Sequence, residues 1–419
     1  MIGLSFVIQF VVLFVLAVYY IRKDKNNFIQ PHAYYTVHIF VKLLLFPVIQ
    51  FFLTNLYRDT SGVVFFNAMI SLSYVFFSIG FSVKKKKDAE ILNRFLKKFN
   101  IANVPEVTLS LHLLVMVLIA IFLFVYLTEK SGVGLSSWLL DPRLGFMHHV
   151  CQRGLGHLYM GSTAIFNFVF LGILFFKVKK VKHLILATTV FVLIFYFYGR
   201  KNLVVFTIFE GIVYYNFFIN KIKFRWAPVI FGLFVVVFSF VFSLYSPQNV
   251  KDSLTKRILK YADYYNNSRM FFRDFDEEFE YAYGKEYLSG LWRYVPRVVY
   301  PNKPYSYGKV KYVTDKYYPG AGKSGNTPET GGPLEEYLNF GVIGVIVIGF
   351  IRGYFTSLFY RYFLKYRNFV GFVLLSNEMG FSIFPIVSGY KILWYLMNIV
   401  LLLLHKQIIL SATAIRVED

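Results

Sequence analysis

The sequence predicts an all-α polytopic membrane protein with about eleven transmembrane helices and one large loop on the outer side. Of the 419 residues, 57% are hydrophobic and only 16% are charged, whereas soluble domains carry roughly 25% charged residues. The apolar residues form long runs, many of them near the ~20 residues that a helix needs to cross a bilayer. These observations exclude a soluble globular protein, and the single cysteine, Cys151, excludes a disulfide framework.

Eleven apolar runs are expected spans, and basic or polar breaks separate them. Every second connection is basic, as an alternating path through the bilayer requires. The breaks after the sixth and tenth spans are short, at Gly199–Asn202 and Ser388–Lys391. The expected spans cover about residues 4–21, 34–53, 61–83, 107–127, 159–178, 183–199, 203–220, 227–245, 337–359, 369–388 and 390–410.

The net charge of +22 is distributed unevenly along the chain. Most of the excess lies on the side of Lys84–Lys87, which we take as the inside because cytoplasmic loops are rich in Lys and Arg. Orientation in the membrane therefore accounts for the net positive charge, and the charge gives no support for a nucleic-acid-binding function. The first span has no basic residue before it, but Arg22, Lys23 and Lys25 follow it, which is the reverse of a secretory signal peptide. We therefore expect an uncleaved anchor, with the N-terminus outside and the C-terminus in the cytoplasm.

One long segment without a span divides the chain into three parts. Residues 1–245 hold spans one to eight, residues 246–336 form an extracytoplasmic loop, and residues 337–419 hold spans nine to eleven. Loops beyond ~15 residues are usually functional or disordered, and the 13 tyrosines of this loop argue against disorder. Within it we expect helical structure from Ser253 to Tyr283, an amphipathic interfacial helix from Tyr287 to Val299, and an ordered loop from Pro301 to Pro333.

Two familiar motifs are excluded by their context. Gly320–Gly325 matches a GxGxxG pattern, but Tyr317 stands where a P-loop needs its first glycine, and no strand–helix unit surrounds it. A group of histidines and a cysteine before span five has a spacing that fits no standard zinc finger: His148, His149, Cys151 and His157. We therefore expect no nucleotide, no metal ion and no other cofactor.

Four charged residues fall inside expected spans, where a charge is costly unless it is paired or faces water. They are Lys42, Glu210, Arg352 and Glu378. We expect them to form internal ion pairs that fix the packing of the helices.

The break between spans six and seven, Tyr198–Asn202, lies at the outer mouth of the expected bundle. Its two adjacent cations, Arg200 and Lys201, run against the positive-inside tendency. Arginine's planar fork suits phosphate oxygens, so an anion-binding role is one interpretation. The alternative is a turn whose charges are solvated.

Three further stretches combine charge, aromatic rings and proline. Gly284–Leu288 (GKEYL) and Val295–Pro304 (VPRVVYPNKP) lie in the long loop, and the prolines of the second hold its cations in an extended path. Pro333–Gly344 (PLEEYLNFGVIG) opens span nine. It places a carboxylate and an amide at the outer end of that span, where Gly341 and Gly344 would allow a close approach of helices.

The order of these motifs resembles the bacterial oligosaccharide repeat-unit polymerases, known as O-antigen or Wzy-type polymerases. The resemblance runs from span five onward and is carried by Gly-Arg at 199–200, Pro-Arg…Pro-x-Lys-Pro at 296–304, and Glu-x-Tyr-x-Asn-Phe-Gly at 335–341. Lys201 is a departure, because the family often has a small residue after the first arginine. The resemblance implies a GT-C-like glycosyltransferase of the inner membrane. Its substrates would be undecaprenyl-pyrophosphate-linked oligosaccharides, joined at the outer face into O-antigen or a related surface polysaccharide.

The resemblance also implies roles for the charged residues of the motifs. Arg200 and Arg297 would bind the pyrophosphate, with Lys303 and Lys201 assisting, because cations there stabilise the charge of the leaving group. Glu335 is the first choice for a base that takes the proton of the acceptor hydroxyl. The next choices are Glu286 and His157, and the expected glycan contacts are Tyr300, Tyr337 and Asn339.

Two alternative functions remain open at this point. An O-antigen ligase would use the same donor but transfer the glycan to a lipid core. A non-enzymatic flippase for lipid-linked oligosaccharides should show two similar halves and short loops, which this sequence lacks. Besides its lipid-linked substrates and membrane lipids, the polymerase interpretation implies a chain-length regulator as a partner.

Overall fold

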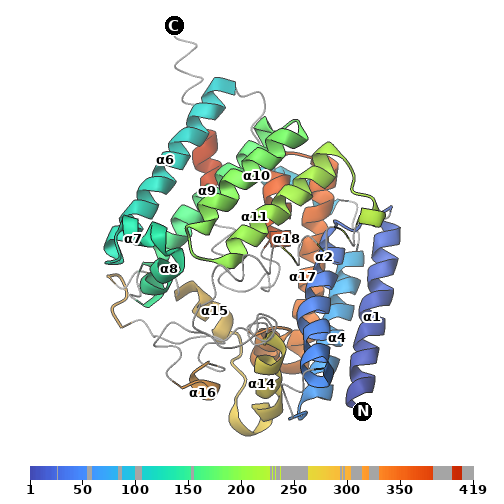
Figure 1. Ribbon diagram of the computed structural model, residues 1–419. Coiled ribbons are helices and arrows are strands. Elements are labelled where there is room, and N and C mark those ends of the chain that lie inside the picture. The colour runs from blue at the N-terminus through green and yellow to red at the C-terminus, as the bar shows by residue number, and fades with distance from the viewer. Residues whose placement is uncertain are drawn as a thin grey trace.

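In the described part of the chain, taken from a computed structural model, helices are the only regular secondary structure and there is no strand (Figure 1). The described residues are 1–25, 27–53, 59–83, 87–99, 106–151, 155–226, 263–292, 298–302, 314–319, 330–380 and 399–407, with the single residues 229, 232, 236 and 295. The all-helical prediction is therefore confirmed for these residues.

Seven of the described helices are long and apolar enough to cross a membrane, as a polytopic membrane protein requires. They are α1 (Ile2–Lys23), the run from α2 to η2 (Pro31–Phe52), α4 (Val63–Ser82), α6 (Glu106–Lys130), α9 (Gly156–Lys177), the run from α11 to η4 (Lys201–Ile219) and α17 (Leu334–Tyr366). Two shorter apolar helices, α10 (Val181–Tyr196) and α18 (Phe369–Gly380), cover parts of two more expected spans. The expected spans at 227–245 and 390–410 lie mostly outside the described residues.

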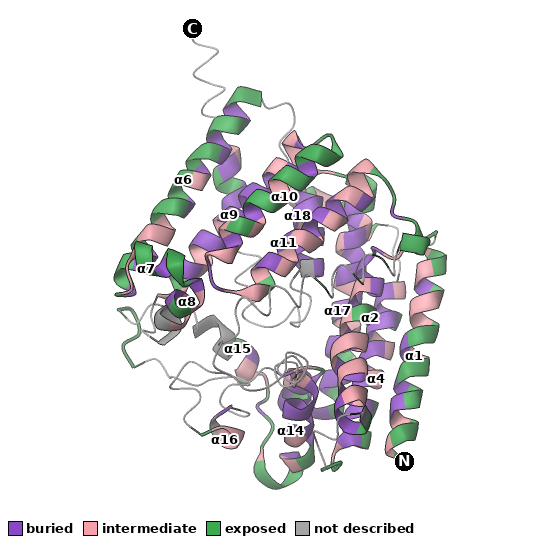
Figure 2. Cartoon of the chain, viewed as in Figure 1, coloured by how far each residue is buried: buried purple, intermediate pink, exposed green. Residues whose placement is uncertain are grey.

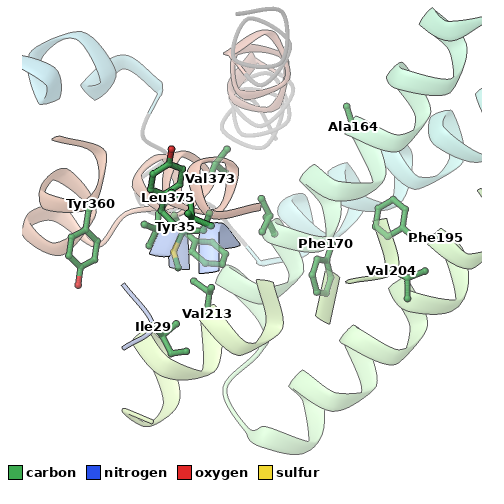
Figure 3. Close-up of a cluster of buried hydrophobic side chains, with 14 of the residues drawn as sticks. Ile29, Tyr35, Ala164, Phe170, Phe195, Val204, Val213, Tyr360, Val373 and Leu375 are labelled. Atoms are coloured by element: carbon green, nitrogen blue, oxygen red, sulfur yellow. The ribbon is translucent and has the colours of Figure 1, made fainter. Parts of the chain in front are cut away.

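The spans differ in how much of their surface other helices cover. In α9, 67% of the apolar window is buried, compared with 17% in α1. Figure 2 accordingly shows many exposed residues along α1 and α6 and mostly buried residues along α9. Phe170 of α9, Phe195 of α10 and Val204 of α11 belong to one buried cluster (Figure 3). We therefore place α9 at the centre of its group of helices and α1 at the edge.

Helices α4 and α17 pack closely because glycines line their contact. A Cβ atom at Gly349 would lie 2.9 Å from the carbonyl oxygen of Ser73, and one at Gly353 would overlap the carbonyl of Phe77. In the other direction, a Cβ at Gly80 would overlap the backbone of α17. Small residues at such positions let two membrane helices approach backbone to backbone.

Helix α14 (Tyr264–Glu278) of the long loop docks on one end of the bundle. The Tyr265 ring lies 5.8 Å from Phe6 near the N-terminus of α1 and 5.0 Å from Phe66 of α4. Arg269 is 2% exposed and donates hydrogen bonds to Asp59 (3.1 Å) and to the backbone of Ser61, in the connection before α4. We call this end, which carries the N-terminus of α1, the α14 end (Figure 1).

The opposite end of the bundle carries the short helix α5 (Asp88–Leu96), and we call it the α5 end. Lys365 of α17 pairs with Glu90 at 2.8 Å. Asn27, in the connection after α1, donates to Tyr360 of α17 at 3.1 Å and accepts from Asn216 of η4 (Tyr215–Ile219) at 3.3 Å. The run from α11 to η4 thus reaches the α5 end with its C-terminal residues, so its N-terminus lies toward the α14 end.

The long loop contains two of its expected features among the described residues. Helical structure expected from Ser253 to Tyr283 is present as α14. The stretch from Tyr287 to Val299, where an interfacial helix is expected, overlaps α15 (Lys285–Trp292), which begins two residues earlier. The place of α15 at the membrane interface stays a prediction. Of the expected ordered loop from Pro301 to Pro333, only the two ends and the single turn α16 (Asp315–Tyr317) are described. The division of the chain at residues 246 and 336 stays a prediction.

Candidate functional site

The turn between α10 and α11 is held by aromatic side chains from two helices. Trp138 of α7 (Leu135–Leu140) donates to the carbonyl of Phe197 at 2.8 Å, and the Tyr159 hydroxyl of α9 donates to the carbonyl of Tyr198 at 3.1 Å. Gly199 has φ +70°, and a Cβ there would overlap the carbonyl of Pro142. Only glycine fits this position, because other residues avoid that backbone region and would clash. The turn fixes where the next residues point.

Three cations gather at this turn, Arg143, Arg200 and Lys201, and we call them the cation cluster. Arg143 of α8 (Pro142–Cys151) lies 5.3 Å from the Phe146 ring centroid, and Arg200 lies 5.6 Å from the same centroid. Arg200 caps α11 and Lys201 is its first residue. Among the described residues, no carboxylate pairs with Arg200. Like charges around one ring repel each other, so the cluster is suited to an oxyanion next to a helix N-terminus.

Helix α17 is interrupted inside the motif that opens it. Phe340 and Gly341 have non-helical dihedral angles, with φ +61° and ψ −148° at Gly341. Glu336 nevertheless pairs with Arg352, sixteen residues along the chain, a separation of ~24 Å in a straight helix. A Cβ at Gly344 would overlap the carbonyl of Glu336. Residues 334–340 therefore form a short helix that folds back on the long one. Gly344 serves this fold-back, whereas we expected it to serve the approach of another helix.

Asn339 ties this fold-back to the long loop. Its backbone carbonyl accepts from the N–H of Tyr283 at 3.1 Å, and its side-chain oxygen accepts from the N–H of Gly284 at 2.9 Å. The carbonyl of Leu338 accepts from Ala282 at 2.9 Å. Asn339 is fully buried, and its amide donates to the carbonyl of Glu335. The sequence motifs at 284–288 and 335–341 are thus brought into contact.

These contacts place α15 beside the fold-back. Tyr287 stacks on Phe340 with 6.3 Å between ring centroids. Burial raises the pKa of the Tyr287 hydroxyl, the charges of Glu336 and Glu335 raise it further, and Arg352 opposes them. Glu335 and Glu286 are both half-buried. The first two choices for a base therefore come from the two motifs that meet here, one on α17 and one on α15.

The other candidate residues lie in different settings. Tyr337 is buried against Phe272 (4.8 Å between centroids) and Phe275 of α14, so its ring is part of the packing of the loop on the bundle. His157 is exposed at the start of α9, and Tyr300 is exposed. Arg297 and Lys303 lie outside the described residues.

The charged residues inside the spans are satisfied in four ways. Arg352 forms the expected ion pair, with Glu336. Glu210 accepts two hydrogen bonds from the Asn167 amide, at 2.9 and 3.1 Å. Glu378 accepts from the Thr356 hydroxyl at 2.9 Å. The Lys42 ammonium lies 4.2 Å from the Tyr264 ring centroid, on a π-helical stretch, η1 (Val41–Leu45).

A small cavity of about 30 Å³ borders Arg352 beneath the end of the long loop. Its walls include Tyr35, which accepts from Arg352 at 2.7 Å, together with His38, Lys42 and Ser73. Within the described ranges, no three His, Cys, Asp or Glu side chains are close enough to hold a metal ion. The stretch Gly320–Gly325 lies outside them.

Two residues were missed by the sequence analysis. Arg143 follows Pro142 in the loop before span five, and its place beside Arg200 depends on the contact between Gly199 and Pro142. Glu336 was not predicted to have a role, because its neighbour Glu335 was the first choice for the base. The only available signal was Arg352, an intramembrane cation that needed a carboxylate.

Taken together, the described residues define a multi-pass helical membrane protein with an anion-suited cluster and a carboxylate-containing site. Over 375 residues the chain is 22% identical to the O-antigen polymerases of Salmonella typhimurium and Salmonella typhi, covering 87% of this chain and 85% of each relative. No family model matches the chain, and no solved structure matches it significantly. The resemblance to the Wzy-type polymerases is confirmed. The matched stretch is longer than the segment from span five to the C-terminus, so it also includes part of the N-terminal third.

Proposed function

We propose that this protein is a glycosyltransferase that polymerises undecaprenyl-pyrophosphate-linked oligosaccharide repeat units at the outer face of the bacterial inner membrane. The observation that carries the proposal is the similarity to two O-antigen polymerases over 87% of the chain. Its product would be O-antigen or a related surface polysaccharide, with an architecture of the GT-C kind and a chain-length regulator as partner.

The distribution of charge supports an orientation with the α14 end outside. Lys23, Lys221 and Lys365 belong to the α5 end, where Lys221 donates to the carbonyl of Lys25. Cytoplasmic connections are the ones enriched in such residues. The N-terminus, residues 246–336 and the cation cluster would then face outward, and the C-terminus would be cytoplasmic. A cysteine at position 298, where the side chain is 94% exposed, should react with an impermeant thiol reagent in spheroplasts of a Cys151→Ser strain. Reaction only after permeabilisation would reverse the orientation.

The cation cluster supports a role in binding the lipid pyrophosphate. As the glycosidic bond to the pyrophosphate breaks, negative charge grows on the leaving group, and preorganised cations stabilise it. Arg200 would supply a bidentate fork, with Arg143 against the same Phe146 ring and Lys201 nearby. Arg297 and Lys303 would approach from the long loop.

The half-buried carboxylates support acid–base chemistry on the acceptor. In the proposed reaction the acceptor hydroxyl attacks the anomeric carbon and loses a proton, which Glu335 would accept. Glu286 on α15 is the second choice and His157 the third. The sugar contacts would come from Tyr300, Tyr337 and Asn339. The last two are buried in this structure, where they hold the loop on α17.

Deletion of the gene separates the proposed function from its alternatives. A polymerase mutant should retain single repeat units on its surface glycan carrier and lose the long chains. Loss of all attached glycan would instead favour the ligase, and accumulation of lipid-linked repeats on the cytoplasmic side would favour a flippase.

Substitution of Arg200 tests the pyrophosphate role. Arg200→Lys keeps the charge but loses the fork, and each charge-assisted hydrogen bond contributes about 1.5–3 kcal/mol. If that energy is used in the transition state, the rate should fall about tenfold to more than a hundredfold. Arg94→Lys, the same change at an exposed position of α5, is the matched control. Normal chain length in Arg200→Ala at wild-type protein level would remove Arg200 from the site.

A further inference from the structure

The hydroxyl of Tyr287 stands out because it is buried without a partner. Tyr287 is 7% exposed, and its hydroxyl has no hydrogen-bond partner among the described residues. Neighbouring contacts hold Tyr287 in place, because the N–H of Gly284, just before α15, donates to Asn339 and the Tyr287 ring stacks on Phe340. A buried hydroxyl without a partner destabilises a fold. Because burying this hydroxyl lowers the stability of the fold, we consider it a candidate for contact with a ligand.

A second orphaned donor belongs to Arg352, whose charge acts on Tyr287. The two terminal nitrogens of Arg352 are bonded to Tyr35 and Glu336, but its Nε has no partner within the described part of the chain. Arg352 is 5% exposed and also borders the small cavity of about 30 Å³. A cavity of that size holds one small polar group, such as a water molecule or a hydroxyl.

The charges around these donors indicate the chemistry of the ligand. Tyr287 packs on Phe340 of the fold-back that carries Glu335 and Glu336, and Arg352 pairs with Glu336. The charges of these three residues act on the Tyr287 hydroxyl. An anion such as a phosphate would be repelled by the two carboxylates. A neutral group with several hydroxyls would instead donate to the carboxylates and accept from Tyr287 and Arg352. The cation cluster has the opposite character and suits an anion.

We propose that Tyr287 and Arg352 form a subsite for the hydroxyls of the acceptor sugar, separate from the cation cluster that binds the pyrophosphate of the donor. The inference rests on the proposed function and adds the place of one substrate. It assigns this subsite to the acceptor, because Glu335, the proposed base, belongs to the fold-back on which Tyr287 packs through Phe340, and a base must reach the acceptor hydroxyl.

The test uses an acceptor that cannot act as a donor. An alkyl glycoside of the strain's own repeat unit lacks the pyrophosphate leaving group, so it can only accept. With the full-length protein in detergent and a fixed lipid-linked donor, Tyr287→Phe should raise the KM for this acceptor about fivefold, the loss of one neutral hydrogen bond. The KM for the donor should not change. Arg200→Lys should lower kcat/KM for the donor and leave the KM for the acceptor unchanged.

Thermal stability distinguishes a ligand contact from a structural one. Tyr287→Phe removes a hydroxyl that has no protein partner, so its melting temperature should equal or exceed that of the wild type. Tyr318→Phe is the matched control, because its hydroxyl donates to Asn267 at 2.7 Å. This control should lower the melting temperature and leave the KM for the acceptor unchanged.

The outcomes separate the subsite from the proposed function. If the wild type extends the acceptor but Tyr287→Phe has an unchanged KM for it, the subsite is wrong and the polymerase function stands. A lower melting temperature or failure of Tyr287→Phe to accumulate would show a protein partner for the hydroxyl and would also overturn the subsite. If the wild type joins no lipid-linked repeats at all, the polymerase function itself fails.

Discussion

The buried ion pair between Glu336 and Arg352 gives the sharpest test of the fold-back. Glu336 is 1% exposed and Arg352 is 5% exposed, so removal of either leaves a charge in a dry site. Breaking a buried pair in this way costs about 3–5 kcal/mol. We expect Glu336→Leu to reach this range, because arginine cannot lose its charge. Arg352→Met should cost less, because the carboxyl group of Glu336 can take up a proton.

The double variant separates the charge from the packing. Replacing a buried pair by apolar residues of similar volume is often neutral for stability, so Glu336→Leu with Arg352→Met should be more stable than Glu336→Leu alone. Melting curves of the purified protein in one detergent, followed by tryptophan fluorescence, give the order of the four proteins. Chain-length analysis of the same strains gives activity. Because Arg352 belongs to the proposed acceptor subsite, the double variant should regain stability without regaining polymer.

Two results would refute this argument. If Glu336→Leu melts at the wild-type temperature, the two side chains do not form a buried pair and the fold-back of residues 334–340 is wrong. If the double variant is no more stable than Glu336→Leu, the two residues are not coupled. Exposed Lys365 and Glu90 form the matched control pair. Removal of Glu90 should leave the melting temperature close to that of the wild type, because exposed ion pairs contribute little to stability.

Three other predictions follow from local contacts. Gly199→Ala should destabilise the protein and shorten the polymer, because a Cβ there would overlap the carbonyl of Pro142. Gly134→Ala, at φ +75° and ψ 155° with open space around it, should cost only the backbone term of about 1–3 kcal/mol. Melting curves and glycan gels compare the two variants. Burial would raise the pKa of Asp59, but hydrogen bonds from Ser61 and the charge of Arg269 hold it well below its usual range. Its contribution to stability is therefore present above about pH 4 and lost as the pH falls further, and melting curves from pH 6 to 3 should be flatter for Asp59→Asn. Glu210→Gln should keep one oxygen that accepts from the Asn167 amide, whereas Glu210→Leu should cost about 1–3 kcal/mol by leaving that amide unpaired. Melting curves compare the two variants, and equal stability would contradict the prediction.

The positions of the spans could be predicted from the sequence because hydropathy is a local property. Each long described helix falls on an expected span, and α14 falls within the helical stretch expected in the loop. A reversal of the chain inside an apolar stretch is harder to predict, because the hydropathy of the sequence does not mark it. The motif from Glu335 to Gly341 has helical residues on both sides, and nothing in its hydropathy marks the break at Phe340. The break becomes visible only through the pair of Glu336 with Arg352.

The candidate site could be predicted in part for the same reason. Arg200 stood out because a cation at an outer boundary is unusual. Its neighbour Arg143 did not, because their proximity depends on α8 packing against Gly199, a tertiary contact. Similarly, no local pattern distinguishes Glu335 from Glu336. Their roles differ because Glu336 lies on the face of the short helix that meets Arg352, and in the described part of the chain Arg352 pairs with Glu336 rather than with Glu335.

The motif from Glu335 to Gly341 therefore combines two kinds of residue. Asn339 and Gly341 serve the backbone: one holds the loop at Gly284, and the other takes dihedral angles that only glycine adopts readily. Tyr337 packs against the phenylalanines of α14, and Glu336 is bound to Arg352. Glu335 is the one carboxylate of the motif that stays half-exposed. A base must have access to substrate, so the packing of its neighbours is the strongest structural argument for proposing Glu335 in that role.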